Sequence, residues 1–181
     1  MSKAVLFFAD GTEECEALLV ADLLRRAKVE VIIASAMGRR ALVSSHGIHL
    51  NADALAEDVD YSDVDMVILP GGIPGTPNLA ENKTVTDTCV SFAKAGKKVA
   101  AICAAPFILG ELDLLEGRHA TCFPGFEKSF PEGAYTGEKV TQDGNIITAS
   151  GMAQSLPFAL ELLRTLAGDK AVEKVAEGIQ L

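Results

Sequence analysis

The sequence predicts an α/β fold in which a mostly parallel, doubly wound sheet is covered by helices on both faces. Short apolar runs alternate with longer amphipathic stretches along the chain, and this alternation is typical of strands that are joined by crossover helices. There is no low-complexity linker, internal repeat or break in composition. The chain has 181 residues, 49% of them apolar, which suits one sizeable core. We therefore expect residues 1–181 to form a single domain.

The first predicted unit is a buried strand followed by a helix. Val5–Ala9 is an uninterrupted apolar run, and Glu14–Arg26 carries leucines and alanines at helical spacing. Thr12 precedes this helix and is a plausible cap, and acidic residues in the first turn favour the positive end of the helix dipole.

The remaining elements follow the same alternation, with two hairpins inserted. Strands are expected over Val31–Ser35, Met66–Leu69 and Val99–Ile102. The hairpins are expected over Ala41–Asn51, turning at His46-Gly47, and over 139–149, turning at Asp143-Gly144. Helices are expected over Thr84–Ala95 and Ser155–Ala167, and in a terminal amphipathic stretch that includes Val172, Val175, Ala176 and Ile179.

Charge and composition exclude several classes of partner. The formal net charge of −9 and the absence of a lysine or arginine run argue against nucleic acid and against an anionic membrane surface. The apolar stretch near the start ends at Asp10, so it is too short for a signal peptide or a membrane span. We expect a soluble cytoplasmic protein that binds neither nucleic acid nor membranes.

The four cysteines are expected to be free thiols. Cys15, Cys89, Cys103 and Cys122 show no C-x-x-C spacing, and no histidine lies nearby at ligand spacing. The pattern does not support a zinc site, and a reducing compartment is the simpler account. We expect no metal and no cofactor.

Cys103 is the strongest candidate for a reactive residue. It ends the strand-like run Val99–Ile102, and the small residues Ala104 and Ala105 follow it before Pro106 opens a helix-like stretch. A sharp turn from strand to helix needs small neighbours, as in the nucleophile elbow of serine hydrolases. The sulfur would stand at a helix N-terminus, so we expect a lowered thiol pKa. The alternative is a cysteine that only fills space behind a strand.

Two other loops are expected to meet this cysteine, because ligands of parallel sheets bind at the carboxyl ends of the strands. The stretch 10–16 is rich in carboxylates, one of which could act as an acid or base if burial raised its pKa. The pair Gly71-Gly72 permits close backbone approach, so its N–H groups could stabilise an oxyanion. Taken alone, the acidic cluster could be a helix cap and the glycines a tight turn.

Three segments together resemble the ThiJ/PfpI family, in the branch of the Parkinson-disease-linked protein deglycase and its bacterial relatives. They are Glu13-Glu14-Cys15-Glu16, Leu69-Pro70-Gly71-Gly72 and Ala100-Ala101-Ile102-Cys103-Ala104-Ala105-Pro106, in this order and spacing. The cysteine segment is the specific one, and the resemblance extends over nearly the whole chain.

The resemblance implies a flavodoxin-like fold, a homodimer and a reactive cysteine that oxidises to the sulfinic acid. By motif position Cys103 is that cysteine, Glu16 is the glutamate that hydrogen-bonds it, and Gly72 and Ala104 supply backbone donors. The activities that the resemblance implies are glyoxalase activity without glutathione, repair of glycated thiols and amines, and chaperoning or sensing under oxidative stress.

The chain departs from the family pattern at several positions. Phe123 stands where the human-like members carry a histidine, so that general base is absent. Ala104 stands where proteolytic members carry a histidine, so we expect no peptidase activity. His46 replaces an arginine that in relatives approaches the cysteine from the partner subunit, which leaves a contact across the dimer open. His119 and Cys122 could be near the site or serve only in packing.

Two hypotheses follow. In the first, the protein is an enzyme that acts on methylglyoxal, glyoxal or their adducts: Cys103 attacks the aldehyde carbon, Glu16 moves the proton, and the amides of Gly72 and Ala104 hold the oxyanion. In the second, it is a redox sensor or stress chaperone in which peroxide oxidises Cys103 without turnover. The missing histidine adds weight to the second.

Overall fold

The computed structural model describes residues 1–181 and is built around a seven-stranded sheet with the order β5-β2-β1-β6-β7-β9-β8. The strands are β1 (Lys3–Phe8), β2 (Glu30–Ser35), β5 (Ala54–Leu55), β6 (Met66–Leu69), β7 (Lys98–Ile102), β8 (Val140–Asp143) and β9 (Ile146–Ala149). All neighbours pair in parallel except β8 with β9. The five main parallel strands follow the flavodoxin-like order 2-1-3-4-5, so the predicted fold class is confirmed.

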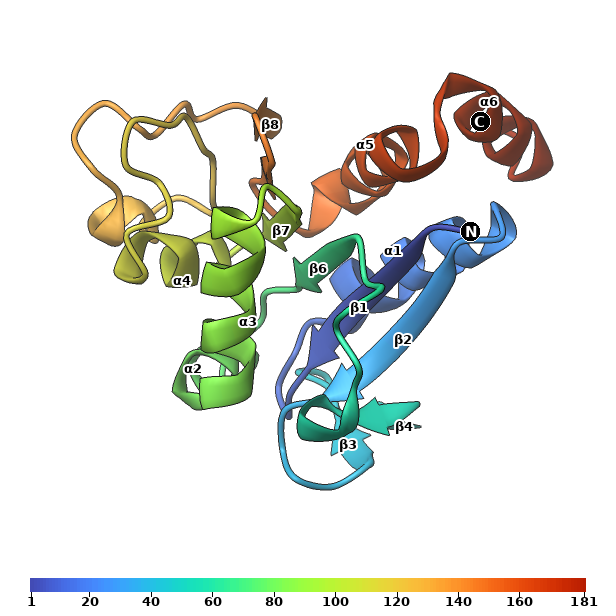
Figure 1. Ribbon diagram of the computed structural model, residues 1–181, viewed down its shortest axis with the longest axis horizontal. Helices are drawn as coiled ribbons and strands as arrows, with labels where there is room; N and C mark the ends of the chain where they lie inside the picture. Colours follow the sequence, from blue (N-terminus) through green and yellow to red (C-terminus); the bar gives the residue numbers. More distant parts are fainter.

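Helices cover both faces of the sheet (Figure 1). One face carries α1 (Glu14–Arg26), α5 (Ser155–Ala167) and α6 (Asp169–Gly178), which pack on an apolar cluster that includes Leu6 and Phe158. The other face carries α2 (Gly75–Glu81), α3 (Lys83–Lys94) and α4 (Pro106–Glu111), which pack on a cluster that includes Phe7 and Leu69. Side chains alternate between the two clusters along β1, as the pleat of a strand requires. None of the helices combines the length and the apolarity needed to cross a membrane.

Most predicted elements are present, and the errors lie in short elements. The first hairpin forms a separate two-stranded sheet of β3 (Ala41–Val43) and β4 (His49–Asn51), as expected. The two-residue strand β5 and the helix α2 were not predicted, because neither is long enough to show a period. The remaining short elements are 3₁₀ turns at Ala56–Asp58, Glu127–Ser129 and Met152–Gln154.

The predicted cap of α1 is wrong. Glu13 is the capping residue, since its carboxylate accepts the backbone N–H of Glu16 at 2.7 Å. The Thr12 hydroxyl instead accepts the N–H of Ala9 at 3.1 Å, which closes the turn after β1. The helix begins at Glu14 as predicted, and the residue directly before it, Glu13, has a side chain long enough to reach the N–H of Glu16.

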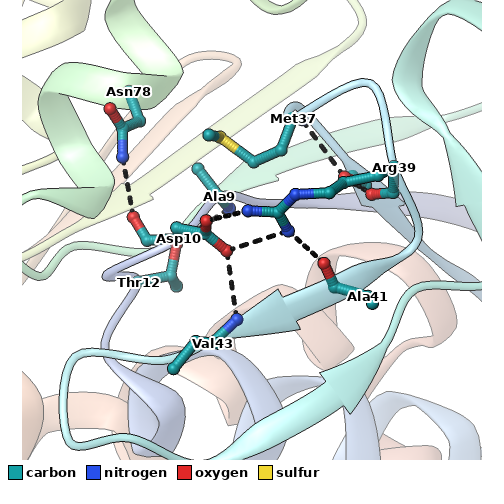
Figure 2. A network of polar contacts seen from close by, with 9 residues as sticks. Ala9, Asp10, Thr12, Met37, Arg39, Ala41, Val43 and Asn78 are labelled. Carbon is teal, nitrogen blue, oxygen red and sulfur yellow. Dashed lines mark hydrogen bonds and ion pairs between the residues drawn. The ribbon is translucent and has the colours of Figure 1, made fainter.

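A polar network ties the first hairpin to the loop after β1 (Figure 2). The carboxylate of Asp10 accepts the N–H of Val43 at 3.0 Å and pairs with the guanidinium of Arg39, which also donates to the carbonyl of Ala41. From α2, the side chain of Asn78 donates to the carbonyl of Asp10 at 2.8 Å. The first hairpin and α2 therefore both hold Asp10, and these contacts fix the start of the loop that leads to α1.

We expect Asp10→Ala to lower the free energy of unfolding by about 1–2 kcal/mol, because the Val43 N–H loses its acceptor. Arg39→Ala should cost less than about 1 kcal/mol, because half of the Arg39 side chain is exposed and water screens the ion pair. Urea unfolding of both variants measures the difference. Equal losses would show that the ion pair, and not the hydrogen bond to the hairpin, holds the network together.

Candidate active site

Two loops meet at the carboxyl ends of β1 and β6, where the strand order reverses. The backbone N–H of Glu13 donates to the carbonyl of Gly71 at 3.0 Å. Gly72 has a φ of +92°, and a Cβ at that position would lie 2.4 Å from the backbone nitrogen of Glu13. No side chain fits between these loops, so the glycine pair is needed for more than a tight turn. Ligands of open parallel sheets bind at this edge.

Cys103 stands directly after β7 on a strained turn. Its φ of +63° is in the left-handed region, which residues other than glycine rarely occupy. The backbone is held on both sides: its N–H donates to the carbonyl of Ala149 at 2.9 Å, and its carbonyl accepts the N–H of Phe123 at 2.8 Å. Ala105 then caps α4, with Pro106 in its first turn. These features match the predicted nucleophile elbow.

Glu16 lies in the first turn of α1 and is fully buried. Its Oε2 accepts the backbone N–H of Gly71 at 2.8 Å, whereas Oε1 is buried with no hydrogen-bond partner. Burial raises the pKa of this carboxyl to about 7, although the hydrogen bonds with Cys103 and Gly71 act in the opposite direction. A carboxyl that titrates near neutral pH can both accept and donate a proton there.

The expected lowering of the Cys103 pKa is wrong. Burial, together with the negative charge of Glu16, raises the pKa of the thiol to about 12. The backbone N–H groups of Ala104 and Gly72 donate to the sulfur and lower the pKa, but by less. The helix dipole is weaker than the sequence suggested, because α4 has only six residues.

At neutral pH the proton therefore belongs to the sulfur, and Glu16 is partly ionised. The carboxylate of Glu16 lies close enough to raise the pKa of the thiol, and it can take the thiol proton as the sulfur attacks. Once protonated, the same group is a neutral acid that donates to the thiolate instead of repelling it. The thiolate thus forms when Glu16 takes the proton during attack, and Cys103 is a neutral thiol at other times.

None of the three histidines makes a hydrogen bond with Cys103. His46 is exposed and its Nδ1 lies 2.9 Å from the carboxylate of Glu14, and His119 Nδ1 lies 3.4 Å from Asp143. The ring of Phe123 is half-exposed beside the elbow. Cys122 lies in the neighbouring segment, and burial raises the pKa of its thiol to about 12, as for Cys103. Cys122 is fully buried whereas Cys103 is partly exposed, so Cys122 is the less accessible thiol.

One group of side chains has the composition of a metal site. Ligand atoms of Glu13, Glu14 and His46 lie within 4.8 Å of one another. The Glu13 carboxylate already accepts a backbone N–H of α1, and Glu14 already contacts Ser45 and His46. The positive end of a helix also disfavours a cation. Helix capping and hydrogen bonding account for this group.

Comparison with known proteins now bears on this geometry. The model of the DJ-1/PfpI family matches residues 2–165. This chain belongs to the DJ-1/PfpI family. Protein dj-1beta of Drosophila melanogaster is 35% identical over 182 residues, which cover 99% of this chain and 97% of the relative. The glutathione-independent glyoxalase DJR-1.2 of Caenorhabditis elegans is 27% identical over 99% of this chain and 96% of its own length. The structure of oxidized DJ-1 from Toxoplasma gondii superposes with a TM-score of 0.95 at 31% identity, over 99% of this chain and 98% of that one.

Sequence reasoning named Gly71 only as part of a pair of possible oxyanion donors, and it missed the contribution of Phe123. Gly71, rather than only Gly72, contacts the reacting groups: its N–H holds Glu16, and a Cβ there would lie 2.7 Å from the Cβ of Cys103. Phe123 fixes the elbow through its backbone N–H, whatever its side chain. The doubled glycine was the available signal for the first. No local pattern indicates the second, because the contact joins segments twenty residues apart.

We expect Glu16 to make the stability of the protein depend on pH. A carboxyl whose pKa rises from 4.5 to about 7 on folding favours the fold below pH 4.5, and this contribution is lost as the pH rises through 7. Wild type should lose this contribution between pH 5 and pH 8, whereas Glu16→Gln should not. The unfolding free energy of Glu16→Gln minus that of wild type should therefore be on the order of 2–3 kcal/mol larger at pH 8 than at pH 5. Urea unfolding at both pH values measures this gain.

The matched control is Glu116→Gln, because Glu116 is an exposed glutamate. Its effect should be the same at both pH values. If Glu16→Gln were likewise independent of pH, the carboxyl of Glu16 would titrate as an ordinary glutamate and could not serve as a base of the kind described above.

Proposed function

We propose that this protein is a cysteine-dependent glyoxalase that converts 2-oxoaldehydes such as methylglyoxal and glyoxal into 2-hydroxy acids. The observation that carries this proposal is the contact between an elbow cysteine and a buried glutamate whose pKa is about 7. The glyoxalase name of the Caenorhabditis elegans relative supports it. Adducts of these aldehydes with thiols and amines present the same reacting carbons, so deglycase activity belongs to the same proposal.

The reaction begins with addition of sulfur to the aldehyde. Glu16 takes the thiol proton while Cys103 Sγ bonds to the aldehyde carbon, and the carbonyl oxygen becomes an alkoxide. This oxygen faces the backbone N–H groups of Gly72 and Ala104, which already point at the sulfur. Return of the proton from Glu16 to the alkoxide gives a neutral hemithioacetal.

The second stage moves hydrogen between two carbons. Glu16, again ionised, removes the proton from the carbon that carries sulfur, and the electron pair moves onto the adjacent ketone oxygen to give an enediolate. The protonated Glu16 then delivers this proton to the second carbon, the hydroxyl proton passes from the first oxygen to the second, and the product is the thioester of a 2-hydroxy acid. Water then hydrolyses the thioester and regenerates the thiol. Oxidation of one carbon balances reduction of the other, so the reaction needs no external oxidant or reductant.

A second candidate function is oxidation sensing through Cys103. The related Toxoplasma gondii structure is that of an oxidized DJ-1, and the histidine position near the elbow holds Phe123 in this chain. Peroxide would oxidise the thiolate to the sulfenic and then the sulfinic acid, with release of one water at each step. A protonated Glu16, whose Oε1 has no other partner, would donate to the product. The same pair of residues serves both functions, and only turnover separates them.

We expect Cys103→Ser to abolish turnover of methylglyoxal and Glu16→Gln to reduce kcat by about 100-fold or more, because the amide cannot act as a base. Alkylation of Cys103 by iodoacetamide should be as fast in Glu16→Gln as in wild type or faster, because the charge that raises the thiol pKa is gone. Steady-state kinetics and peptide mass spectrometry measure the two effects. The exposed Cys15 provides an internal reference for alkylation.

Full activity of Glu16→Gln would mean that Glu16 only positions the sulfur and that another group is the base. An inactive wild-type protein whose Cys103 is nevertheless oxidised by stoichiometric peroxide would favour the sensor. Cleavage of an unfolded protein substrate that depends on Cys103 would contradict the expectation that Ala104 excludes peptidase activity.

We also propose a homodimer that uses α1 and the first hairpin. Leu18 on α1 and Ile48 in the hairpin turn are large apolar side chains with 37% and 48% of their surface exposed. His46 is in the hairpin turn near Ile48, and its Nδ1 contacts Glu14 at the start of α1. A partner subunit that covered Leu18 and Ile48 would therefore come close to His46. Leu18→Lys should shift the protein toward monomer at micromolar concentration, as measured by analytical ultracentrifugation. A wild-type protein that sediments as a monomer would remove this interface and the cross-subunit role of His46.

A further inference from the structure

An apolar hollow of about 340 Å³ lies between the loop after β6 and the helix after β7. Its walls include Ile73, Ala80, Phe107 and Phe126. Glu81 is the one charged residue that lines it. The mechanism described above uses none of these side chains.

The hollow adjoins the reacting groups. Ile73 directly follows Gly72, whose N–H points at the sulfur, and Phe107 is in the first turn of α4, the helix that follows Cys103. Another wall residue, Phe126, donates its backbone N–H to the carbonyl of Phe123. The two rings pack edge to face, with 6.4 Å between their centroids. The segments that hold the thiol therefore also form the hollow.

The lining selects for an uncharged, apolar group. No lysine or arginine is present to bind a carboxylate or phosphate, and the carboxyl of Glu81 repels anions. The rings of Phe107 and Phe126 offer edges and faces to another ring. A methyl group would leave most of 340 Å³ unfilled, whereas a phenyl group gives these walls a surface to pack against.

We propose that the hollow receives the side group of the substrate and that this chain prefers 2-oxoaldehydes with an aryl or bulky alkyl group, of which phenylglyoxal is the simplest aryl case. The choice of an aldehyde rests on the proposed function, whereas the binding of the side group does not. Ile73, Ala80, Phe107 and Phe126 are thus specificity residues.

The first test compares kcat/KM for phenylglyoxal and methylglyoxal. Wild type should favour phenylglyoxal by about 10-fold or more, since extra apolar contacts in a pocket discriminate by about 10- to 200-fold. Ala80→Leu fills the hollow from α2 and should lower the phenylglyoxal value about 10-fold, while methylglyoxal changes by less than about 2-fold. Ala93→Leu is the matched control, because Ala93 on α3 packs against the same apolar cluster as Ala80 but does not line the hollow.

A wild-type enzyme with equal kcat/KM values for the two aldehydes would overturn the proposal and leave the glyoxalase function standing. So would an Ala93→Leu variant with the same selective loss as Ala80→Leu. Circular dichroism and thermal melting confirm that both variants fold.

A second test does not require turnover. Acetophenone and acetone carry the same two side groups but no aldehyde, so each can occupy the site without reacting. Acetophenone should halve the rate of Cys103 alkylation at a concentration about 10-fold lower than acetone, and this difference should vanish in Ala80→Leu. Selective protection in a protein that turns over neither aldehyde would support the hollow and refute the glyoxalase. Equal protection by the two ketones would overturn the hollow.

Discussion

The close backbone contact between the loop after β1 and the loop after β6 is the constraint on which the site depends. The N–H of Glu13 bonds the carbonyl of Gly71, and the N–H of Gly71 bonds the carboxylate of Glu16, so the two loops exchange hydrogen bonds in both directions. Any Cβ at residue 71 would collide with Cys103 and Glu16 together. Because the strand order reverses between β1 and β6, the helices that leave them go to opposite faces, and the space between the loops stays open to a ligand.

That contact explains why a glutamate is buried without a basic partner. Burial without ion pairing destabilises a carboxylate, and the left-handed backbone of Cys103 is also unfavourable. Other interactions in the fold offset both costs. Strain and desolvation of this kind concentrate at functional sites, where they tune the chemistry. Here they leave the thiol protonated at rest and place beside it a group that titrates near neutral pH. The reactivity of the sulfur then depends on the protonation of Glu16 more than on the short helix α4.

Membership of the DJ-1/PfpI family accounts for the shared part of this arrangement, and Phe123 changes what surrounds it. Phe123 cannot accept a proton as a histidine does, so the chemistry depends more heavily on Glu16. The ring of Phe123 packs against Phe126, and Phe126 in turn lines the hollow.

The amino-acid sequence by itself determined the order and type of the long elements, because apolar periodicity along α1, α5 and the buried strands reflects burial on a sheet face. It also indicated Cys103 as an elbow, since the small residues around a strained turn are consecutive in the chain. The protonation state of the pair was decided only by the tertiary structure. Whether a dipole or desolvation dominates at Cys103 depends on how much water the neighbouring loops exclude. It also depends on how close Glu16 comes, from the helix that follows a strand two positions away from β7 in the sheet. The hollow was likewise decided by the tertiary structure, because its walls come from segments far apart in sequence that the folded sheet brings together.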